Sequence, residues 1–187
     1  AAGEVVERPS SVVKELVENA IDAKATAVTV EIKEGGISFI RITDNGCGIE
    51  KKQVPIAFLR HSTSKIRSVE DLLSIHSLGF RGEALSSIAA VAQVELITKT
   101  YEELTGTRYV IEGSKEIENE EIGAPEGTTF IVRNLFYNVP ARRKFLKTAQ
   151  TEAGYISDLM ERMALSHPDV SFKFINNGQI RLHTSGK

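Results

Sequence analysis

The chain contains very little cysteine and no long apolar run, and both absences exclude classes of protein. Cys47 is the only cysteine in 187 residues, which excludes an intrachain disulfide and a cysteine-based metal cluster. A lone thiol fits a reducing cytosol. No apolar run approaches the roughly 18 residues that a membrane helix needs, and no signal peptide is visible, so we expect no membrane partner.

The chain is nearly neutral overall. Its formal net charge of −2 argues against a globally basic nucleic-acid binder but leaves room for a local basic patch. No internal repeat, low-complexity tract or Pro/Gly-rich linker divides it, so we expect one domain over residues 1–187. The chain begins Ala1-Ala2-Gly3-Glu4 without an initiator methionine, and we expect a fragment of a longer protein.

The spacing of apolar residues predicts an α+β fold with two layers. Helices are predicted over 9–23, 51–59, 83–91 and 151–166. Strands are predicted over 28–33, 37–43, 93–100, 107–112, 115–122 and 128–133, with a last hairpin around Asn176-Asn177-Gly178. Several strands in hairpins with a few helices indicate a two-layer α/β sandwich and do not fit a regular βαβ repeat.

The first predicted helix carries a polar stripe. At about 100° per residue, Glu15, Asn19 and Asp22 fall within roughly 60° of one another, opposite the apolar face. A carboxylate can polarise a water molecule, and an amide oxygen can bind Mg²⁺. The alternative interpretation is a solvated helix face.

A second candidate site follows the second strand at 44–49, Asp-Asn-Gly-Cys-Gly-Ile. Two glycines at alternate positions allow the backbone to approach a ligand closely, and Asp44 offers an acceptor for an exocyclic amine. A tight turn with a capping aspartate remains the alternative. The chain has no GxxxxGK[ST] loop, and no GxGxxG follows a strand, so a bound nucleotide would need another kind of site.

Two further segments offer contacts for the same kind of ligand. Residues 77–85 form a glycine-flanked loop that opens a helix, which is an anion site, and Arg81 adds positive charge there. Thr128, at the start of a strand, offers a hydroxyl to Asp44 and a base. A flexible connector and an ordinary β-branched strand residue are the alternatives.

A basic cluster lies outside these segments. Arg142, Arg143 and Lys144 follow Pro140 and predict either a DNA or partner contact or a solvated helix start. The region 61–82 has weak periodicity, which is typical of a functional lid or a disordered loop.

The order and spacing of these segments resemble the GHKL ATPases, the superfamily of gyrase, the large heat-shock chaperone, histidine kinases and MutL. The motif series is ELVENAIDA (15–23), DNGCG (44–48), GFRGEAL (79–85) and GTT (127–129). Three segments resemble the bacterial MutL family of DNA mismatch-repair ATPases in particular: GEVVERP (3–9), RHSTSK (60–65) and LFYNVPARRKFL (135–146). The resemblance implies a Bergerat-type sandwich whose mixed, mainly antiparallel sheet carries helices on one face.

The resemblance also implies residue roles in magnesium-dependent ATP hydrolysis. Glu15 is expected to be the general base, Asn19 the Mg²⁺ ligand, and Asp44 the acceptor for the adenine amine, supported by Thr128. Residues 63–82 are expected to form a lid over the phosphates. The other expected nucleotide contacts are Asp22, Gly46, Gly48, Ile49, Thr63, Ser64, Lys65, Leu78, Gly79, Phe80, Arg81 and Gly82.

For the whole protein, the resemblance implies a cytoplasmic, nucleoid-associated bacterial switch that homodimerises on ATP binding. Expected partners are DNA, a mismatch-recognition protein of the MutS type, and a downstream nuclease or helicase. The family's amino-terminal arm, the second domain with the catalytic lysine and the carboxyl-terminal dimerisation domain are expected to lie outside this chain, so hydrolysis by the fragment should be weak. Another GHKL ATPase, a histidine-kinase catalytic domain and a nucleotide-regulated binding module are the alternatives.

Overall fold

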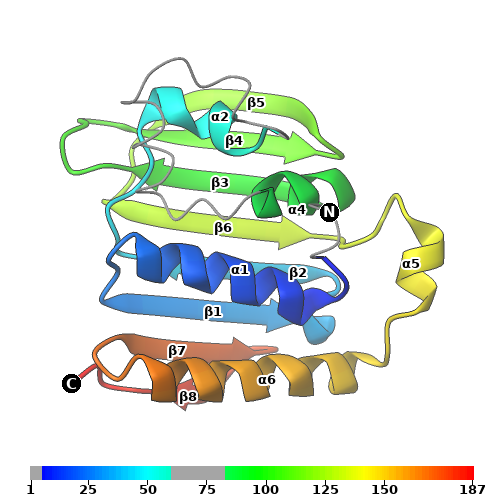
Figure 1. Ribbon diagram of the computed structural model, residues 1–187. Coiled ribbons are helices and arrows are strands. Elements are labelled where there is room, and N and C mark those ends of the chain that lie inside the picture. The colour runs from blue at the N-terminus through cyan, green and yellow to red at the C-terminus, as the bar shows by residue number, and fades with distance from the viewer. Residues whose placement is uncertain (1–5, 60–82) are drawn as a thin grey trace.

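The computed structural model describes residues 6–59 and 83–187. They form one eight-stranded sheet with helices on one face (Figure 1), which confirms the predicted α+β sandwich. The helices are α1 (Pro9–Asp22), α2 (Val54–Ala57), α4 (Ala84–Val91), α5 (Pro140–Lys144) and α6 (Ala149–Ser166), with 3-10 turns η2 (Glu34–Gly36) and η3 (Lys51–Gln53). The strands are β1 (Ala27–Lys33), β2 (Phe39–Asp44), β3 (Gln93–Lys99), β4 (Gly106–Glu112), β5 (Lys115–Ile122), β6 (Gly127–Arg133), β7 (Ser171–Asn176) and β8 (Gln179–His183).

The sheet is mainly antiparallel. Its strand order is β5-β4-β3-β6-β2-β1-β7-β8, and only β1 and β7 pair in parallel. The register places Asp44, the last residue of β2, opposite Thr128 of β6. β6 lies between β2 and β3, so the ends of three neighbouring strands meet near these two residues.

The core lies between the sheet and the helices. Alternate residues of β1 are buried beneath α1, and α1 presents Val12, Val13, Leu16 and Val17 to the sheet. Burial of each large aliphatic side chain stabilises the fold by about 1.5–3 kcal/mol. Figure 1 shows α6 beside α1, over β7 and β8. The sheet and α6 together fix the orientation of α1, and hence of its polar stripe.

The bounds of several helices differ from the predicted ones for local reasons. The helix predicted over 51–59 is split into η3 and α2, with a proline in the first turn of α2. α6 begins two residues earlier than predicted because the Thr148 hydroxyl accepts the Thr151 N–H at 3.2 Å and caps the first turn. The short exposed helix α5 agrees with the solvated helix start that was one of the two interpretations of residues 142–144. Among the described residues, no helix is long and apolar enough to cross a membrane.

Candidate functional site

The carboxylate of Asp44 lies at the end of β2 in a half-buried position. Its Oδ1 accepts the Gly46 N–H at 2.7 Å. Burial raises the pKa of Asp44 to about 6, while hydrogen bonds from the backbone N–H groups of Gly46 and Thr128 act in the opposite direction. Asp44 is therefore a poorly solvated acceptor that is still mainly ionised at neutral pH.

The loop after Asp44 is pressed between α1 and the end of β3. Cys47 donates its N–H to the Ala23 carbonyl at 2.9 Å. A Cβ at Gly46 would lie 2.7 Å from that same Ala23 oxygen, and a Cβ at Gly48 would overlap the Lys99 carbonyl. Gly48 also has a φ of +76°. Both glycines are therefore required by space and, at Gly48, by backbone conformation.

Asn45 anchors the same loop, a role that the sequence did not reveal. Its Oδ1 accepts the N–H groups of Thr26 and Ala27 at 2.8 and 3.0 Å, and its Nδ2 donates to Thr26 Oγ1 at 2.9 Å. This side chain ties the loop to the chain entering β1. An Asn after a strand is too common a turn residue to have indicated this pairing.

A buried hydroxyl network supports the loop from the other side. Thr98 of β3 is 1% exposed, and its Oγ1 accepts the Ile49 N–H at 2.9 Å. The same oxygen lies 3.0 Å from the Gly127 carbonyl and 2.8 Å from Thr128 Oγ1. Thr98 donates to the carbonyl and accepts from Thr128 in the arrangement that satisfies all three groups. Two predicted site residues, Ile49 and Thr128, therefore meet at Thr98, which the sequence analysis missed.

The polar stripe of α1 lies at positions between the buried and the exposed face of the helix. Glu15, Asn19 and Asp22 are all partly buried. Oδ1 of Asn19 is buried and accepts no hydrogen bond from any residue that the structure describes. Leaving such an acceptor unpaired costs about 1–3 kcal/mol, and orphaned buried groups are rare in folded proteins. The position of this oxygen fits a ligand that supplies the missing contact.

The chemistry of this oxygen suits a hard cation held jointly with a second molecule. Within the described ranges, no group of three or more histidine, cysteine, aspartate or glutamate side chains could hold a metal ion. A single amide oxygen at Asn19 is a suitable Mg²⁺ ligand, but Mg²⁺ requires six oxygens. Phosphate oxygens and water supply the others in sites of this kind.

The structure brings part of the predicted set together. The contact between Ala23 and the loop at 46–47 places the last turn of α1 against the loop that follows Asp44. The predicted contacts at Thr63, Ser64, Lys65, Leu78, Gly79, Phe80, Arg81 and Gly82, and the lid over 63–82, lie outside the described residues and stay predictions. The helix α5 contains Arg142, Arg143 and Lys144. It projects from the end of the sheet opposite to the Asp44 loop (Figure 1).

The motif order and this geometry agree with a family model. Residues 7–130 match the model described as histidine kinase-, DNA gyrase B-, and HSP90-like ATPase. The chain belongs to that ATPase family. The match includes α1, the Asp44 loop and the start of β6, which are the elements that build the site.

Within the family, the chain is an ATPase domain of the MutL type. It is 83% identical over 186 residues to the DNA mismatch repair protein MutL of Agathobacter rectalis, covering 100% of this chain and 29% of that protein. It is 55% identical over 186 residues to MutL of Caldanaerobacter subterraneus, again covering 100% of this chain and 32% of the relative. The chain thus spans less than a third of the length of these relatives.

Solved structures of this domain type have the same fold. The Aquifex aeolicus MutL ATPase domain complexed with ADP superimposes with a TM-score of 0.80 at 36% identity, covering 98% of this chain and 65% of that one. A crystal structure of the amino-terminal domain of a DNA repair protein gives a TM-score of 0.81 at 30% identity, covering 99% of this chain and 56% of the other.

The hydroxyl network predicts that the folded domain loses stability when the Thr98 hydroxyl is removed. Thr98→Val should destabilise the MutL-type domain by about 1–3 kcal/mol because the Ile49 N–H loses its acceptor. In thermal unfolding this corresponds to a decrease of the Tm by roughly 2–4 °C for each kcal/mol.

Thr107 on the neighbouring strand provides a matched control. It faces Thr98 across the β3–β4 pair and is also 1% exposed, but its hydroxyl has no hydrogen-bond partner among the described residues. Thr107→Val should leave the Tm unchanged or raise it. Equal Tm values for the two variants would contradict the assigned role of Thr98.

Proposed function

We propose that this chain binds ATP and hydrolyses it with Mg²⁺, as the nucleotide switch of a MutL-type mismatch-repair protein. The proposal rests on two features that lie on either side of the contact between Gly46 and Ala23. The half-buried Asp44 carboxylate lies on one side of Gly46. On the other side lies the end of α1, the helix that carries the Asn19 oxygen, which has no hydrogen-bond partner among the described residues. The related Aquifex domain complexed with ADP adds support.

Asp44 recognises the adenine base in this proposal. A partly desolvated carboxylate accepts a hydrogen bond from the exocyclic amine, and poor solvation makes that bond more favourable than in water. Gly46, Gly48 and Ile49 shape the base pocket, because the two glycines let the loop pack closely against the carbonyls of Ala23 and Lys99. Thr98 holds Ile49 and Thr128 in place through hydrogen bonds to the Ile49 N–H and the Thr128 hydroxyl.

Asn19 and Asp22 face the phosphate end of the nucleotide. The Asn19 Oδ1 contributes one ligand to Mg²⁺, which would neutralise charge on the phosphate oxygens when bound. Asp22 lies three residues further along the same face of α1 and is assigned to the nucleotide contacts. Amide and carboxylate oxygens are both suitable ligands for Mg²⁺.

Glu15 is the general base. It lies four residues before Asn19, a spacing that places two helix side chains about 5–6 Å apart at their Cβ atoms. The attacking water can therefore lie between the Glu15 carboxylate and the terminal phosphate, and its proton passes to Glu15 as the new P–O bond forms. The bond to the leaving ADP oxygen breaks in the same displacement.

The remaining functions belong to the whole protein and are part of the proposal. Lid ordering by ATP closes a homodimer, and a second domain supplies a lysine to the site. The switch then acts on DNA, a mismatch-recognition protein of the MutS type, and a downstream nuclease or helicase, in the nucleoid region of a bacterial cytoplasm. The DNA mismatch repair proteins at 83% and 55% identity support this assignment.

Replacing the general base should separate hydrolysis from binding. Glu15→Gln should lower the rate of phosphate release by the full-length protein by about 10²–10⁴-fold, because proton abstraction is lost. ATP affinity measured by calorimetry should change less than threefold. Glu161→Gln, an exposed glutamate on α6, is the control and should retain full activity. A binding module without catalysis would give the same phosphate release in all three proteins.

The raised pKa of Asp44 predicts a pH dependence of binding. The folded-state pKa of about 6 lies above the ordinary value of 3.8, so the proton is bound more tightly in the folded state. As the pH falls through 6, protonation therefore stabilises the fold but removes the charge that accepts the adenine amine. Affinity for ATP should be roughly tenfold lower near pH 5 than near pH 7.5.

Asp44→Asn separates this effect from titration of the nucleotide itself. The variant should bind ATP more weakly at neutral pH and retain only the pH dependence of the phosphates. Parallel pH profiles for the variant and the unaltered chain would contradict the assignment of Asp44 to adenine.

A further inference from the structure

A cavity of about 540 Å³ lies between the first half of α6 and the hairpin formed by β7 and β8. Its volume is within the range of small-molecule and peptide sites. Three of the side chains that line it are amides, at Gln150, Asn176 and Asn177, and Arg181 is the only charged one among the described residues. The cavity shares no residue with the proposed nucleotide site.

The walls of the cavity are fixed by contacts between η2, the hairpin and α6. Asn177 Oδ1 accepts the Glu34 N–H at 3.3 Å, and the Asn177 N–H donates to the Ile32 carbonyl at 3.0 Å. A Cβ at Gly35 would lie 2.5 Å from the Ala149 carbonyl oxygen, so η2 packs directly on the start of α6. The cavity therefore has a defined shape without a ligand.

Gly154 lies within α6 at a position that does not require glycine. A Cβ built there would meet no atom within 4 Å, so a larger side chain has room. Glycine inside a helix is unfavourable relative to alanine, because its backbone loses more conformational freedom on folding. Gly154 also lines the cavity. The missing side chain therefore leaves the cavity open along the helix.

An irregularity in β8 brings Arg181 to the cavity. Leu182 and Ile180 pair with successive residues of β7, so Arg181 between them is an extra residue in the ladder. A bulge of this kind bends the strand and redirects a side chain. Ile180 beside it is 57% exposed, so the bulge does not serve to bury an apolar side chain. What the bulge provides is a cation at the cavity wall.

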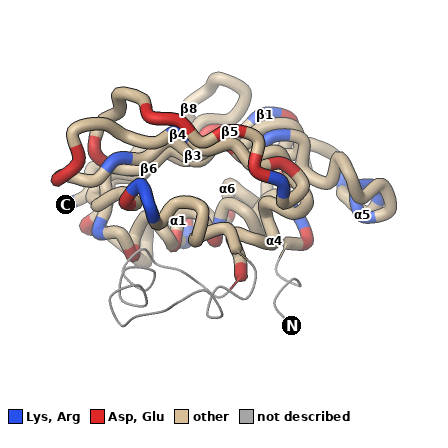
Figure 2. The backbone as a smooth tube through the Cα atoms, turned by 90° about the horizontal axis from the view of Figure 1, so that it is seen from above, with Lys and Arg blue, Asp and Glu red and all other residues tan. Residues whose placement is uncertain are grey.

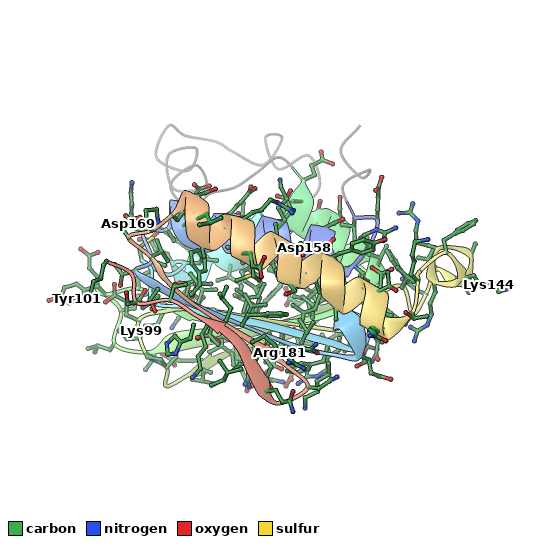
Figure 3. All side chains as sticks on the ribbon, turned by 90° about the horizontal axis from the view of Figure 1, so that it is seen from below. Lys99, Tyr101, Lys144, Asp158, Asp169 and Arg181 are labelled. Carbon is green, nitrogen blue, oxygen red and sulfur yellow. The ribbon has the colours of Figure 1, made fainter. Side chains whose placement is uncertain are left out.

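The charge of Arg181 is not matched within the described part of the chain. Its guanidinium makes no ion pair there, and no described carboxylate lines the cavity. Asp158 of α6 lines a different groove and lies apart from Arg181 in Figure 3. The cations that Figure 2 shows on α5 also lie outside the cavity. An anion would complete the site, and the planar guanidinium fits a carboxylate with two parallel hydrogen bonds.

Asn176 adds an unsatisfied acceptor to the same cavity. Its Oδ1 is buried and accepts no hydrogen bond from a described residue. Because buried polar groups are rarely left unpaired, this oxygen fits a ligand that carries a donor. A peptide N–H is such a donor. The amides of Gln150 and Asn177 suit a peptide as well, since each offers both a donor and an acceptor.

We propose that this cavity binds an acidic peptide segment of a partner protein. A glutamate or aspartate carboxylate of the segment pairs with Arg181, a neighbouring peptide N–H donates to Asn176 Oδ1, and the peptide backbone passes over Gly154. Inorganic phosphate would pair with Arg181 but would offer no peptide backbone to the amide side chains. The inference does not rest on the assignment of the nucleotide site.

The test is saturation-transfer difference NMR with the full-length protein and two acetylated and amidated peptides, Gly-Glu-Gly-Glu-Gly and Gly-Gln-Gly-Gln-Gly. The glutamate peptide should bind roughly tenfold more tightly than the glutamine peptide, because only the former pairs with a guanidinium. Arg181→Glu should weaken binding of the glutamate peptide by at least about tenfold. The control is Arg162→Glu, an exposed arginine of α6 outside the cavity, and it should bind the peptide like the unaltered protein.

Gly154 and Asn176 separate binding from folding. Gly154→Ala and Gly154→Leu should both leave the Tm unchanged or raise it, because the helix gains a better helix former. Only the leucine fills the cavity, so only Gly154→Leu should abolish peptide binding. Asn176→Ala should also retain the Tm, since it removes an unpaired acceptor, and should weaken binding by about threefold to tenfold.

Three results would overturn the proposal: equal affinity for the two peptides, equal effects of Arg181→Glu and Arg162→Glu, or full binding by Gly154→Leu. Displacement of the glutamate peptide by an equal concentration of inorganic phosphate would also overturn it, because the cavity would then be a simple anion site. ATP hydrolysis by these variants should match that of the unaltered protein, since none of the substituted residues belongs to the nucleotide site.

Discussion

The site depends on one close approach, between Gly46 and the carbonyl of Ala23. A Cβ at Gly46 would lie 2.7 Å from that oxygen and 3.1 Å from Asp44 Oδ1, so any larger residue would separate α1 from the end of β2. The Cys47 N–H closes the same contact with a hydrogen bond of 2.9 Å. On the helix side of this contact, α1 is held by its packing against the sheet and against α6. The proposed adenine acceptor and metal ligand consequently belong to one rigid unit.

The same unit contains polar groups whose burial is unfavourable without a ligand. Burial shifts the pKa of Asp44 upward, and the Asn19 oxygen is buried without a partner in the described residues. Each such group reduces the stability of the free chain. The hydroxyl of Thr98 and the amide of Asn45 offset part of this cost by satisfying backbone groups around the loop. A nucleotide with its cation would satisfy both remaining groups.

Much of the fold could be predicted because the strands are amphipathic and the turns carry glycine. The motif residues of α1 and of the Asp44 loop also follow from the sequence, since their types and spacing limit the chemistry. The Thr98 network could not be predicted because it joins residues 29 to 49 positions apart through ordinary strand hydroxyls and backbone groups. The half-buried state of the α1 stripe depends on tertiary packing, which helical spacing alone does not specify.

The central claim is that Asn19 holds the cation of a bound nucleotide, and calorimetry of ATP binding with and without magnesium tests it most directly. The unaltered chain should bind ATP more tightly in magnesium than in chelator. Asn19→Ala should lose that increment and bind as the unaltered chain does in chelator, whereas Asn119→Ala, an exposed control on β5, should retain it. If Asn19→Ala retained the full magnesium increment, the account of this site would be wrong.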